Sequence, residues 1–470
     1  MTEVIRLLLR TEAPVHLGTD EVYEPLGFVI RPETQELEAF EPADFLERLP
    51  KKDREQFLQL CREGTLPSLL RLYRFMRDHR HLVQGRKVGL CPGLAEHYQQ
   101  VLNLKESDFV KQLNRFTIHR TAWQQEDKRP YIPGSAVKGA LRTAYLNVLQ
   151  RQKKITKKFD SSRRLEETLL EGSFATDPFR LVKVSDFQAV GEVKTRVVYA
   201  VNQRKEGGSG RGPYQIMEVI EPGSWFVGHL RVEHLSEGEK RLAEIKGPLN
   251  FDTLLQSARF FYQQEKKRED QELFGVGVRQ PEWKMPAEGM LLRLGRHSGA
   301  EAVTIMGHRR IKIMAPRGQP SQYLDHATTL WLAADYHQPE KRHKAHLRPF
   351  GWVTLFPLTP ELARQVRERE EAWEQSRRKE DKSDKPQGEE GPATDMSISP
   401  AEETWPEAHL SWNPGRGELT AIWQGRKAFA KDKGLVPEVF HKKLFKERKS
   451  ITAQVVLDPD KFRILKIEPR

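Results

Sequence analysis

Residues 131–145 have the sequence Tyr131-Ile-Pro-Gly-Ser-Ala-Val-Lys-Gly-Ala-Leu-Arg-Thr-Ala-Tyr145, which predicts a short extended segment, a tight turn and then a helix. Pro133 has no N–H donor and disfavours helical backbone in the residue before it, so the helix should begin after it. Gly134 lacks a Cβ, which permits a sharp turn and the close approach of another backbone. We expect the hydroxyl of Ser135 to cap the helix by accepting a hydrogen bond from its first turn.

The predicted helix carries two cations that suit a phosphate. Lys138 and Arg142 are four residues apart, so they lie together on one face. A cation in the first turn is repelled by the positive end of the helix dipole unless an anion neutralises it. The alternative is an ordinary strand-to-helix turn with two solvated cations. A P-loop is excluded because its Gly-Lys-Ser/Thr ending is absent. The buried face is predicted to contain Val137, Ala140, Leu141, Ala144, Tyr145 and Val148.

The composition favours a polyanionic partner. The 470 residues include 78 Lys and Arg against 66 Asp and Glu, a formal net charge of +12, which favours nucleic acid over a membrane. The only cysteines are Cys61 and Cys91, which argues against a disulfide scaffold or a cysteine zinc site. No apolar run is long enough to span a membrane, and the first ten residues lack a signal-peptide pattern. We therefore expect a cytoplasmic protein without a metal or cofactor and without a membrane partner.

Two loops provide further candidate ligands for an anion. The first is Pro14-Val-His-Leu-Gly18, which ends a strand predicted over residues 4–15 and contains His16. The second is Gly295-Arg-His-Ser-Gly299, which follows a predicted strand at residues 290–294. Its glycines permit positive φ and outward N–H groups, and Arg293, Arg296 and His297 surround it. A structural role for His16 and a simple β-turn at residues 295–299 are the alternatives.

A glycine-rich segment at residues 202–213 predicts a flexible hairpin tip. Arg204 and Arg211 lie in it, and glycines next to cations can wrap around a phosphate backbone. A tip without a functional role is the alternative.

The last quarter of the chain differs from the rest. Thr359 is expected to cap a charged helix, and residues 383–404 have the composition of a disordered linker. Residues 409–470 predict a separate unit with strands at 419–423, 451–457 and 462–467. Residues 426–449 contain nine Lys or Arg and three Asp or Glu, interleaved with Phe429 next to Trp423. Rings among cations are typical of single-strand nucleic-acid binders, and a protein-docking module is the alternative.

Several of these motifs resemble one family. Ile132-Pro-Gly-Ser-Ala-Val-Lys-Gly-Ala-Leu-Arg142 resembles the signature of the RAMP superfamily, the RNA-binding subunits of CRISPR effector complexes. The segment Pro14-Val-His-Leu-Gly18, followed by Tyr23-Glu-Pro-Leu-Gly-Phe-Val-Ile30, resembles the opening of the type III-A (Csm) subunits that cap the 3′ end of the guide RNA. Shorter resemblances follow in family order at residues 221–224, 295–299 and 350–352. The family's glycine-rich loop is represented here by Gly295 and Gly299 alone.

The resemblance implies an α+β fold with two ferredoxin-like (RRM-like) halves. The first would span residues 1–240, with a helical insertion at about 41–110, and the second residues 241–358. A charged helix and disordered linker at 359–408 and a small basic β-rich unit at 409–470 would follow.

The resemblance also implies a role. The protein would bind CRISPR guide RNA without cutting it, with target RNA and other RAMP subunits as further partners. The motifs and the resemblance together give a candidate RNA-binding set without a catalytic or metal-ligating member: His16, Gly18, Gly134, Ser135, Lys138, Arg142, Arg204, Arg211, Arg293, Gly295, Arg296, His297 and Gly299.

Two other functions fit the sequence. A metal-independent endoribonuclease could use histidine as general acid and base, if folding brings together two of His16, His119, His297 and His308. An assembly scaffold that binds only protein is the second alternative. No zinc-protease, serine-hydrolase or P-loop motif is present.

Overall fold

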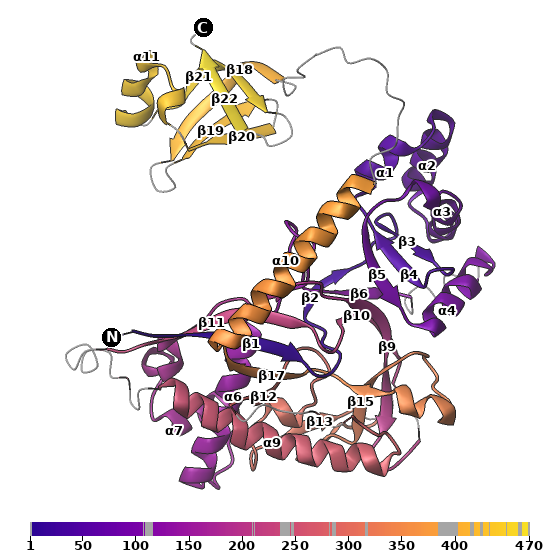
Figure 1. Ribbon diagram of the computed structural model, residues 1–470, viewed down its shortest axis with the longest axis vertical. Coiled ribbons are helices and arrows are strands. Elements are labelled where there is room, and N and C mark those ends of the chain that lie inside the picture. Colours follow the sequence, from indigo (N-terminus) through magenta and orange to yellow (C-terminus); the bar gives the residue numbers. More distant parts are fainter. Residues whose placement is uncertain are drawn as a thin grey trace. The chain divides into compact units, whose positions relative to one another are not determined.

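The computed structural model describes residues 2–106, 108, 116–208, 210, 212–235, 245, 249–281, 283, 288–314, 318–383, 403–413, 418–423, 426–431, 433–447, 449–458 and 463–468. The chain forms two compact units, Met1–Asp384 and Lys385–Arg470 (Figure 1). Within the described residues, no helix has both the length and the apolar composition needed to cross a bilayer.

The first sheet of the large unit has the order β12-β17-β1-β11-β7, with β8 also pairing with β11. Its neighbouring strands are all antiparallel. The strands are β1 (Thr2–Thr11), β7 (Val182–Val184), β8 (Gln188–Val190), β11 (Trp225–Glu233), β12 (Met290–Arg293) and β17 (Trp352–Pro357). Because successive side chains alternate along a strand, Leu7 and Leu9 of β1 enter the main core while Leu8 enters a second cluster.

Helices cover both faces of this sheet. The helices α6 (Gly134–Lys153) and α9 (Phe251–Gly275) pack against each other and against β12 (Figure 1). On the other face, Leu362 and Val366 of α10 (Pro360–Ser383) pack with Leu8 and Trp225. The predicted cap of α10 is confirmed, because the N–H of Leu362 donates to Oγ1 of Thr359 at 3.3 Å.

The second sheet has the order β2-β6-β10-β9-β5-β4-β3, and β15 pairs with both β9 and β16. Its strands are β2 (Gly18–Val22), β3 (Phe28–Arg31), β4 (Glu36–Ala39), β5 (Arg86–Leu90), β6 (Ile118–Thr121), β9 (Thr195–Arg204), β10 (Gln215–Ile220), β15 (Thr329–Ala334) and β16 (Arg348–Pro349). Both sheets contain strands from each side of residue 240. The division into two ferredoxin-like halves stays a prediction, whereas the mixed α+β class is what the structure has.

The segment predicted as a helical insertion contains α1 (Pro42–Arg48), α2 (Lys51–Glu63), α3 (Leu66–Asp78) and α4 (Pro92–Leu102). The first three surround a core of their own that includes Phe45, Phe57 and Phe75. The segment also contains β5, which the sequence analysis did not predict and which joins the second sheet between β4 and β9. The remaining elements of the large unit are η1 (Arg80–Leu82), α7 (Ser162–Leu170), η3 (Phe174–Thr176), η4 (Pro178–Leu181), η5 (Glu301–Val303), β13 (Ile311–Ile313), β14 (Gln322–Leu324) and η6 (Lys341–His346).

The small unit is a closed barrel with the order β18-β19-β20-β22-β21. Its elements are β18 (Glu403–Asn413), β19 (Glu418–Trp423), β20 (Arg426–Ala430), η7 (Lys433–Leu435), α11 (Glu438–His441), η8 (Lys442–Lys446), β21 (Ile451–Asp458) and β22 (Arg463–Glu468). The predicted start at residue 409 was wrong, because β18 begins at Glu403 and a bulge between Trp405 and Ala408 carries it past Pro406. Residues 384–402, predicted to be disordered, lie outside the described residues.

The turn before α6 differs from the prediction in its partners. The helix begins at Gly134, Ser135 is exposed, and no side chain of the N-cap residue caps the helix. The N–H of Gly134 donates instead to Oδ1 of Asp186 at 2.8 Å. A Cβ on Gly134 would collide with the carbonyl oxygens of Val184 and Ser185. The backbone that approaches this glycine is therefore the chain's own, and a carboxylate already binds the first N–H.

Two glycines of α6 provide a matched test of this packing. Gly134→Ala should lower the free energy of unfolding by about 1–3 kcal/mol, because its methyl group has no space. Gly139→Ala should raise it by about 1 kcal/mol, because that Cβ meets nothing within 4 Å and alanine favours the helix. Urea unfolding of the two variants measures both changes, and shifts of the same sign would contradict the assigned role of Gly134.

Candidate RNA-binding surface

The loops that follow β1 and β12 are in direct contact, although they are far apart in sequence. The N–H of Arg296 donates to the carbonyl oxygen of His16 at 2.9 Å. Gly295 has φ 80°, and a Cβ there would collide with the same carbonyl oxygen. The fold thus requires a glycine at this position, and it brings together His16, Gly295, Arg296 and His297 from the candidate set.

His16 is buried and fixed by the protein. Its Nδ1 lies 2.6 Å from the carbonyl oxygen of Glu218, which can only accept, so Nδ1 carries the proton of the hydrogen bond. Burial lowers the pKa of His16, and the positive charge of Arg296 lowers it further. Gly18 lies beside it, where a Cβ would be 3.2 Å from Nε2 of His16. The ring is a neutral link between the first loop and β10.

His297 is held in a similar way. Its ring stacks on Trp331 with 4.4 Å between ring centroids, and Nε2 lies 3.0 Å from Oε1 of Gln215. Burial and then the charge of Arg296 lower its pKa to about 3, so the ring is neutral at physiological pH. Its backbone has φ 62°, a conformation that residues other than glycine rarely adopt.

Arg296 is the cation that this arrangement leaves at the surface. Its side chain is exposed, and no ion pair binds it among the described residues. His119 of β6 is half-buried nearby, and its pKa is lowered by burial and then by Arg296. The sequence analysis considered His119 only as a candidate for catalysis, because the strand pattern gives no indication that β6 and the loop after β12 meet.

Arg293 is not available to an external ligand. It is 3% exposed, and its Nη2 lies 2.6 Å from Oε1 of Glu269 while its Nε donates to the carbonyl oxygen of Phe350. The sequence analysis placed Arg293 among the RNA-binding candidates, whereas in the fold its partner is a buried carboxylate of α9. Gly299, with φ 79°, lies over it, and a Cβ there would be 3.1 Å from Nη1 of Arg293.

The two cations of α6 have different surroundings. Arg142 is bound by two carboxylates, Glu166 at 2.8 Å and Asp177 at 2.6 Å. These pairs neutralise it within the chain, so a phosphate is not needed to explain its position. Lys138 has no ion pair among the described residues, and its pKa is lowered by burial and then by nearby Lys183. Lys138 and Lys183 line one hollow of the surface.

Arg204 is exposed at the end of β9, next to glycines with positive φ. Arg211 lies outside the described residues. Lys205 points inward, with Nζ 2.7 Å from Glu272 and 2.8 Å from Glu301. The hairpin tip is therefore anchored by one cation while the preceding one faces solvent.

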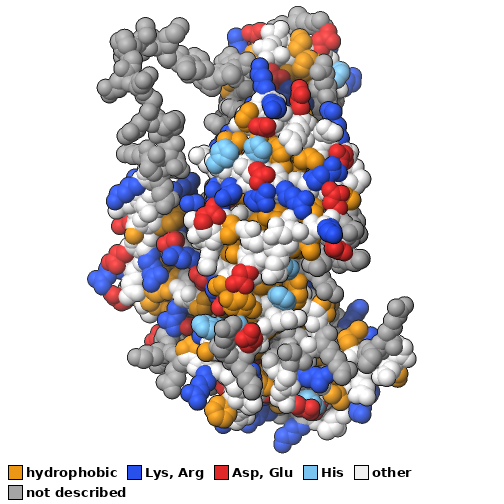
Figure 2. All heavy atoms as spheres, turned by 90° about the vertical axis from the view of Figure 1, so that its right-hand side faces the viewer, with side chains coloured by type: hydrophobic (Ala, Val, Ile, Leu, Met, Phe, Trp, Pro, Cys, Tyr) orange, Lys and Arg blue, Asp and Glu red, His pale blue; other side chains and the backbone are white. Residues whose placement is uncertain are grey.

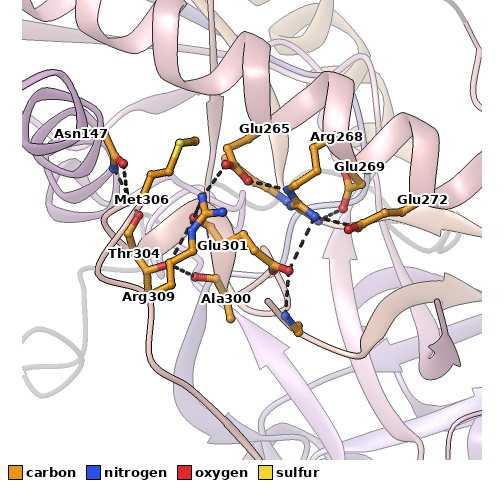
Figure 3. Close-up of polar contacts among 12 residues, drawn as sticks. Asn147, Glu265, Arg268, Glu269, Glu272, Ala300, Glu301, Thr304, Met306 and Arg309 are labelled. Atoms are coloured by element: carbon orange, nitrogen blue, oxygen red, sulfur yellow. Dashed lines mark hydrogen bonds and ion pairs between the residues drawn. The ribbon is translucent and has the colours of Figure 1, made fainter. Parts of the chain in front are cut away.

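A buried network of charges lies beneath the loop after β12 (Figure 3). Arg309 lies 2.5 Å from Oε1 of Glu265, whose Oε2 is 3.0 Å from Arg268. Burial alone would raise the pKa of Glu301, but Lys205 and Arg268 lower it to about 2. The sequence carried a signal for this network, because Glu265 lies in register with the apolar positions of α9, where a solvated charge is not expected.

The surface charge is mixed. Figure 2 shows one face on which Lys and Arg side chains form a band, with Asp and Glu side chains among them. Because the two signs of charge are mixed, the net charge of the chain does not by itself identify the residues that contact a ligand.

In the described part of the chain, no group of three or more His, Cys, Asp or Glu is placed to hold a metal ion.

Comparisons with known proteins show what this chain is similar to. Residues 8–255 match the family model of the RAMP superfamily. A protein chain in the cryo-EM structure of a Csm–crRNA–target RNA ternary complex of a type III-A CRISPR-Cas system is similar in fold, with a TM-score of 0.50 and 18% identity over 75% of this chain and 100% of that chain. The crystal structure of Csm5 from T. onnurineus gives a TM-score of 0.45 and 17% identity over 74% of this chain and 99% of that one. No curated protein matches the chain.

The buried network predicts a pH-dependent contribution to stability. Glu301→Gln should lower the free energy of unfolding at neutral pH by roughly 1.5–3 kcal/mol, because it removes one of the carboxylates that neutralise Lys205 and Arg268, while both cations keep Glu272 as a partner. The carboxylate contributes above its unfolded pKa of about 4.3, and the contribution is lost as pH falls toward the folded pKa of about 2.

Urea unfolding of the wild type and of Glu301→Gln between neutral and acidic pH measures this difference. The difference in the free energy of unfolding between the wild type and Glu301→Gln should become smaller below about pH 4.3. Glu361→Gln removes an exposed ion pair with Arg364 and should leave the free energy of unfolding almost unchanged, because water and salt screen such a pair. A difference that stays constant with pH would contradict the role assigned to Glu301.

Proposed function

The chain belongs to the RAMP superfamily, and from this premise we propose that it is a non-catalytic RNA-binding subunit of a type III-A CRISPR ribonucleoprotein. In this role it binds the guide RNA near its 3′ end and caps the backbone filament of the complex in antiviral defence. Its partners are the guide RNA, the target RNA and neighbouring RAMP subunits. The division of residues 1–358 into two RRM-like halves is part of the same proposal.

The observation that carries the proposal is the contact between the two loops at His16 and Gly295. It leaves the side chain of Arg296 exposed while its backbone is held by His16, and a backbone that is already ordered lowers the entropic cost of holding a phosphate. Sequence-independent contacts to phosphates suit a protein that must hold guides of any sequence.

Two more cations, one exposed and one half-buried, support an extended contact with a backbone. Arg204 stands at the end of β9, and Lys138 has no ion pair within the described chain. Lys138 also has Lys183 as a neighbour, which lowers its pKa. A phosphate between these two lysines would relieve their repulsion. We therefore assign the guide contact to Arg296, Arg204 and Lys138, and not to Arg142 or Arg293.

The ribonuclease alternative has one observation in its favour. A proton on His16 or on His119 would lower the pKa of His297, so three of the four candidate histidines lie near one another. Yet Nδ1 of His16 is bound by a backbone carbonyl and His297 is stacked on Trp331. A general acid must be protonated near neutral pH, and all three pKa values are lowered. This chemistry favours a binding role.

The proposed role predicts that loss of Arg296 changes the affinity for RNA. Arg296→Ala should weaken binding of single-stranded RNA and lower the salt dependence of the affinity by about 0.7, the contribution of one phosphate contact. Arg62→Ala is the control, since Arg62 is exposed on α2 and makes no ion pair in the described structure. Fluorescence anisotropy over a range of salt concentrations measures both slopes. Equal slopes for the two variants would show that Arg296 does not contact the RNA backbone.

The proposed role also predicts that the protein does not cleave RNA. The purified protein should leave guide and target RNA intact, with or without divalent cations, on a denaturing gel. His119→Ala and His297→Ala identify the source of any cleavage that does occur, because a contaminating nuclease would be unaffected by them. Cleavage that His119→Ala abolishes in a folded protein would establish the ribonuclease instead.

A further inference from the structure

The barrel of the small unit has the connectivity of a known nucleic-acid-binding fold. In chain order its strands lie as first, second, third, fifth and fourth, and the sheet is closed. The third and fifth strands pair in parallel, at Phe429 and Arg463, and the other pairs are antiparallel. The helices α11 and η8 connect the third strand to the fourth. This is the five-stranded Greek-key barrel called the OB-fold, which binds oligonucleotides across its second and third strands.

The side chains on those two strands separate cleanly into an inner and an outer set. Leu419 and Ala421 of β19 point into the barrel with Ala428 of β20, and all three are fully buried. The outer set is Thr420, Ile422, Lys427 and Phe429. Because inward and outward residues alternate along a barrel strand, this outer set forms one continuous surface.

The strand register arranges the outer side chains in two rows across β18, β19 and β20. Ser411, Thr420 and Phe429 form one row, and His409, Ile422 and Lys427 form the other. Phe429 is 42% exposed and Ile422 is 36% exposed, so an aromatic ring and an aliphatic side chain face solvent next to a lysine. No ring stacks on Phe429 among the residues that the structure describes.

The segment that begins with β20 and continues through α11 and η8 is rich in cations. Residues 426–449 contain nine Lys or Arg against three Asp or Glu. Lys427 and Lys431 are exposed and unpaired within the described part of the barrel, whereas Arg426 is held by Glu403 at 2.6 Å. The area that two apolar side chains expose is far smaller than the roughly 800 Å² per partner that a stable protein interface buries. A ring beside cations suits bases on a charged backbone.

We propose that the outer face of β18, β19 and β20 is a second nucleic-acid site, which binds a single strand independently of the surface on the large unit. The ring of Phe429 stacks on a base, and Lys427 and Lys431 contact the phosphates that flank it. Stacking on an aromatic ring is tolerant of sequence, because every base has a π-face.

The test uses the full chain with oligouridylate RNA and oligothymidylate DNA of about 16 nucleotides, the upper end of an OB-fold site. Phe429→Ala should weaken binding on the order of tenfold, and Phe429→Tyr should retain it, because a phenol ring still stacks. Lys427→Ala should lower the salt slope by about 0.7. Phe274→Ala is the control, since Phe274 is an exposed phenylalanine of the large unit.

Crosslinking separates this site from the surface proposed on the large unit. Photo-crosslinked 4-thiouridine RNA should mark peptides within residues 419–431, and Arg296→Ala should leave those crosslinks in place. Loss of both RNA and DNA affinity on Phe429→Ala identifies a general single-strand site, and loss of RNA affinity alone identifies a site that uses the 2′-hydroxyl. Unchanged affinity for both strands, or crosslinks confined to the large unit, would overturn the proposal and leave protein docking as the role of this face.

Discussion

The candidate surface of the large unit depends on the buried charges between α9 and the loop after β12. Glu265, Glu269 and Glu301 are almost fully buried, and each forms an ion pair with a cation that is distant from it in the sequence. A buried carboxylate that loses its partner is strongly destabilising, so the arginines of the loop must stay close to α9. The chain is thus held to α9 at Arg293 and Arg309, on either side of Arg296, whose N–H donates to the carbonyl oxygen of His16.

A second buried glutamate, Glu218 of β10, holds the side of the loop contact that contains His16. Glu218 of β10 accepts hydrogen bonds from the hydroxyl of Tyr23 at 2.8 Å and the N–H of Thr121 at 3.2 Å, and it pairs with Arg86 at 2.8 Å. Its backbone carbonyl binds His16. Several arginines of this basic chain therefore neutralise internal carboxylates, and the residues left for a polyanion are fewer than the composition implies.

The two proposed sites use different parts of nucleic-acid chemistry. On the large unit, Arg296 offers an electrostatic contact to phosphate, while the histidines beside it are neutral and held by the protein. On the barrel, Phe429 adds a stacking surface next to Lys427. Electrostatic contacts weaken with salt, whereas stacking is much less sensitive to it, so the relative weight of the two sites should change with ionic strength.

The sequence by itself determined the features that depend on neighbouring residues. The turn at Pro133 and Gly134, the helix after it, the cap at Thr359 and the aromatic and basic character of the tail follow from local backbone limits and composition. The same local view missed β5 and extended the linker over the start of β18, because Pro406 marks a break that a bulge accommodates.

Only the tertiary structure decided which cations stay exposed and which are bound inside the chain. Ser135 and Arg142 looked suited to a phosphate, but Asp186 caps the helix and Asp177 binds the arginine. Arg293 looked like part of an anion loop, but Glu269 holds it in the core. In each case the partner lies at least 24 residues away along the chain. Ion pairing over such separations is set by the packing of strands and helices, which no local pattern of residues records.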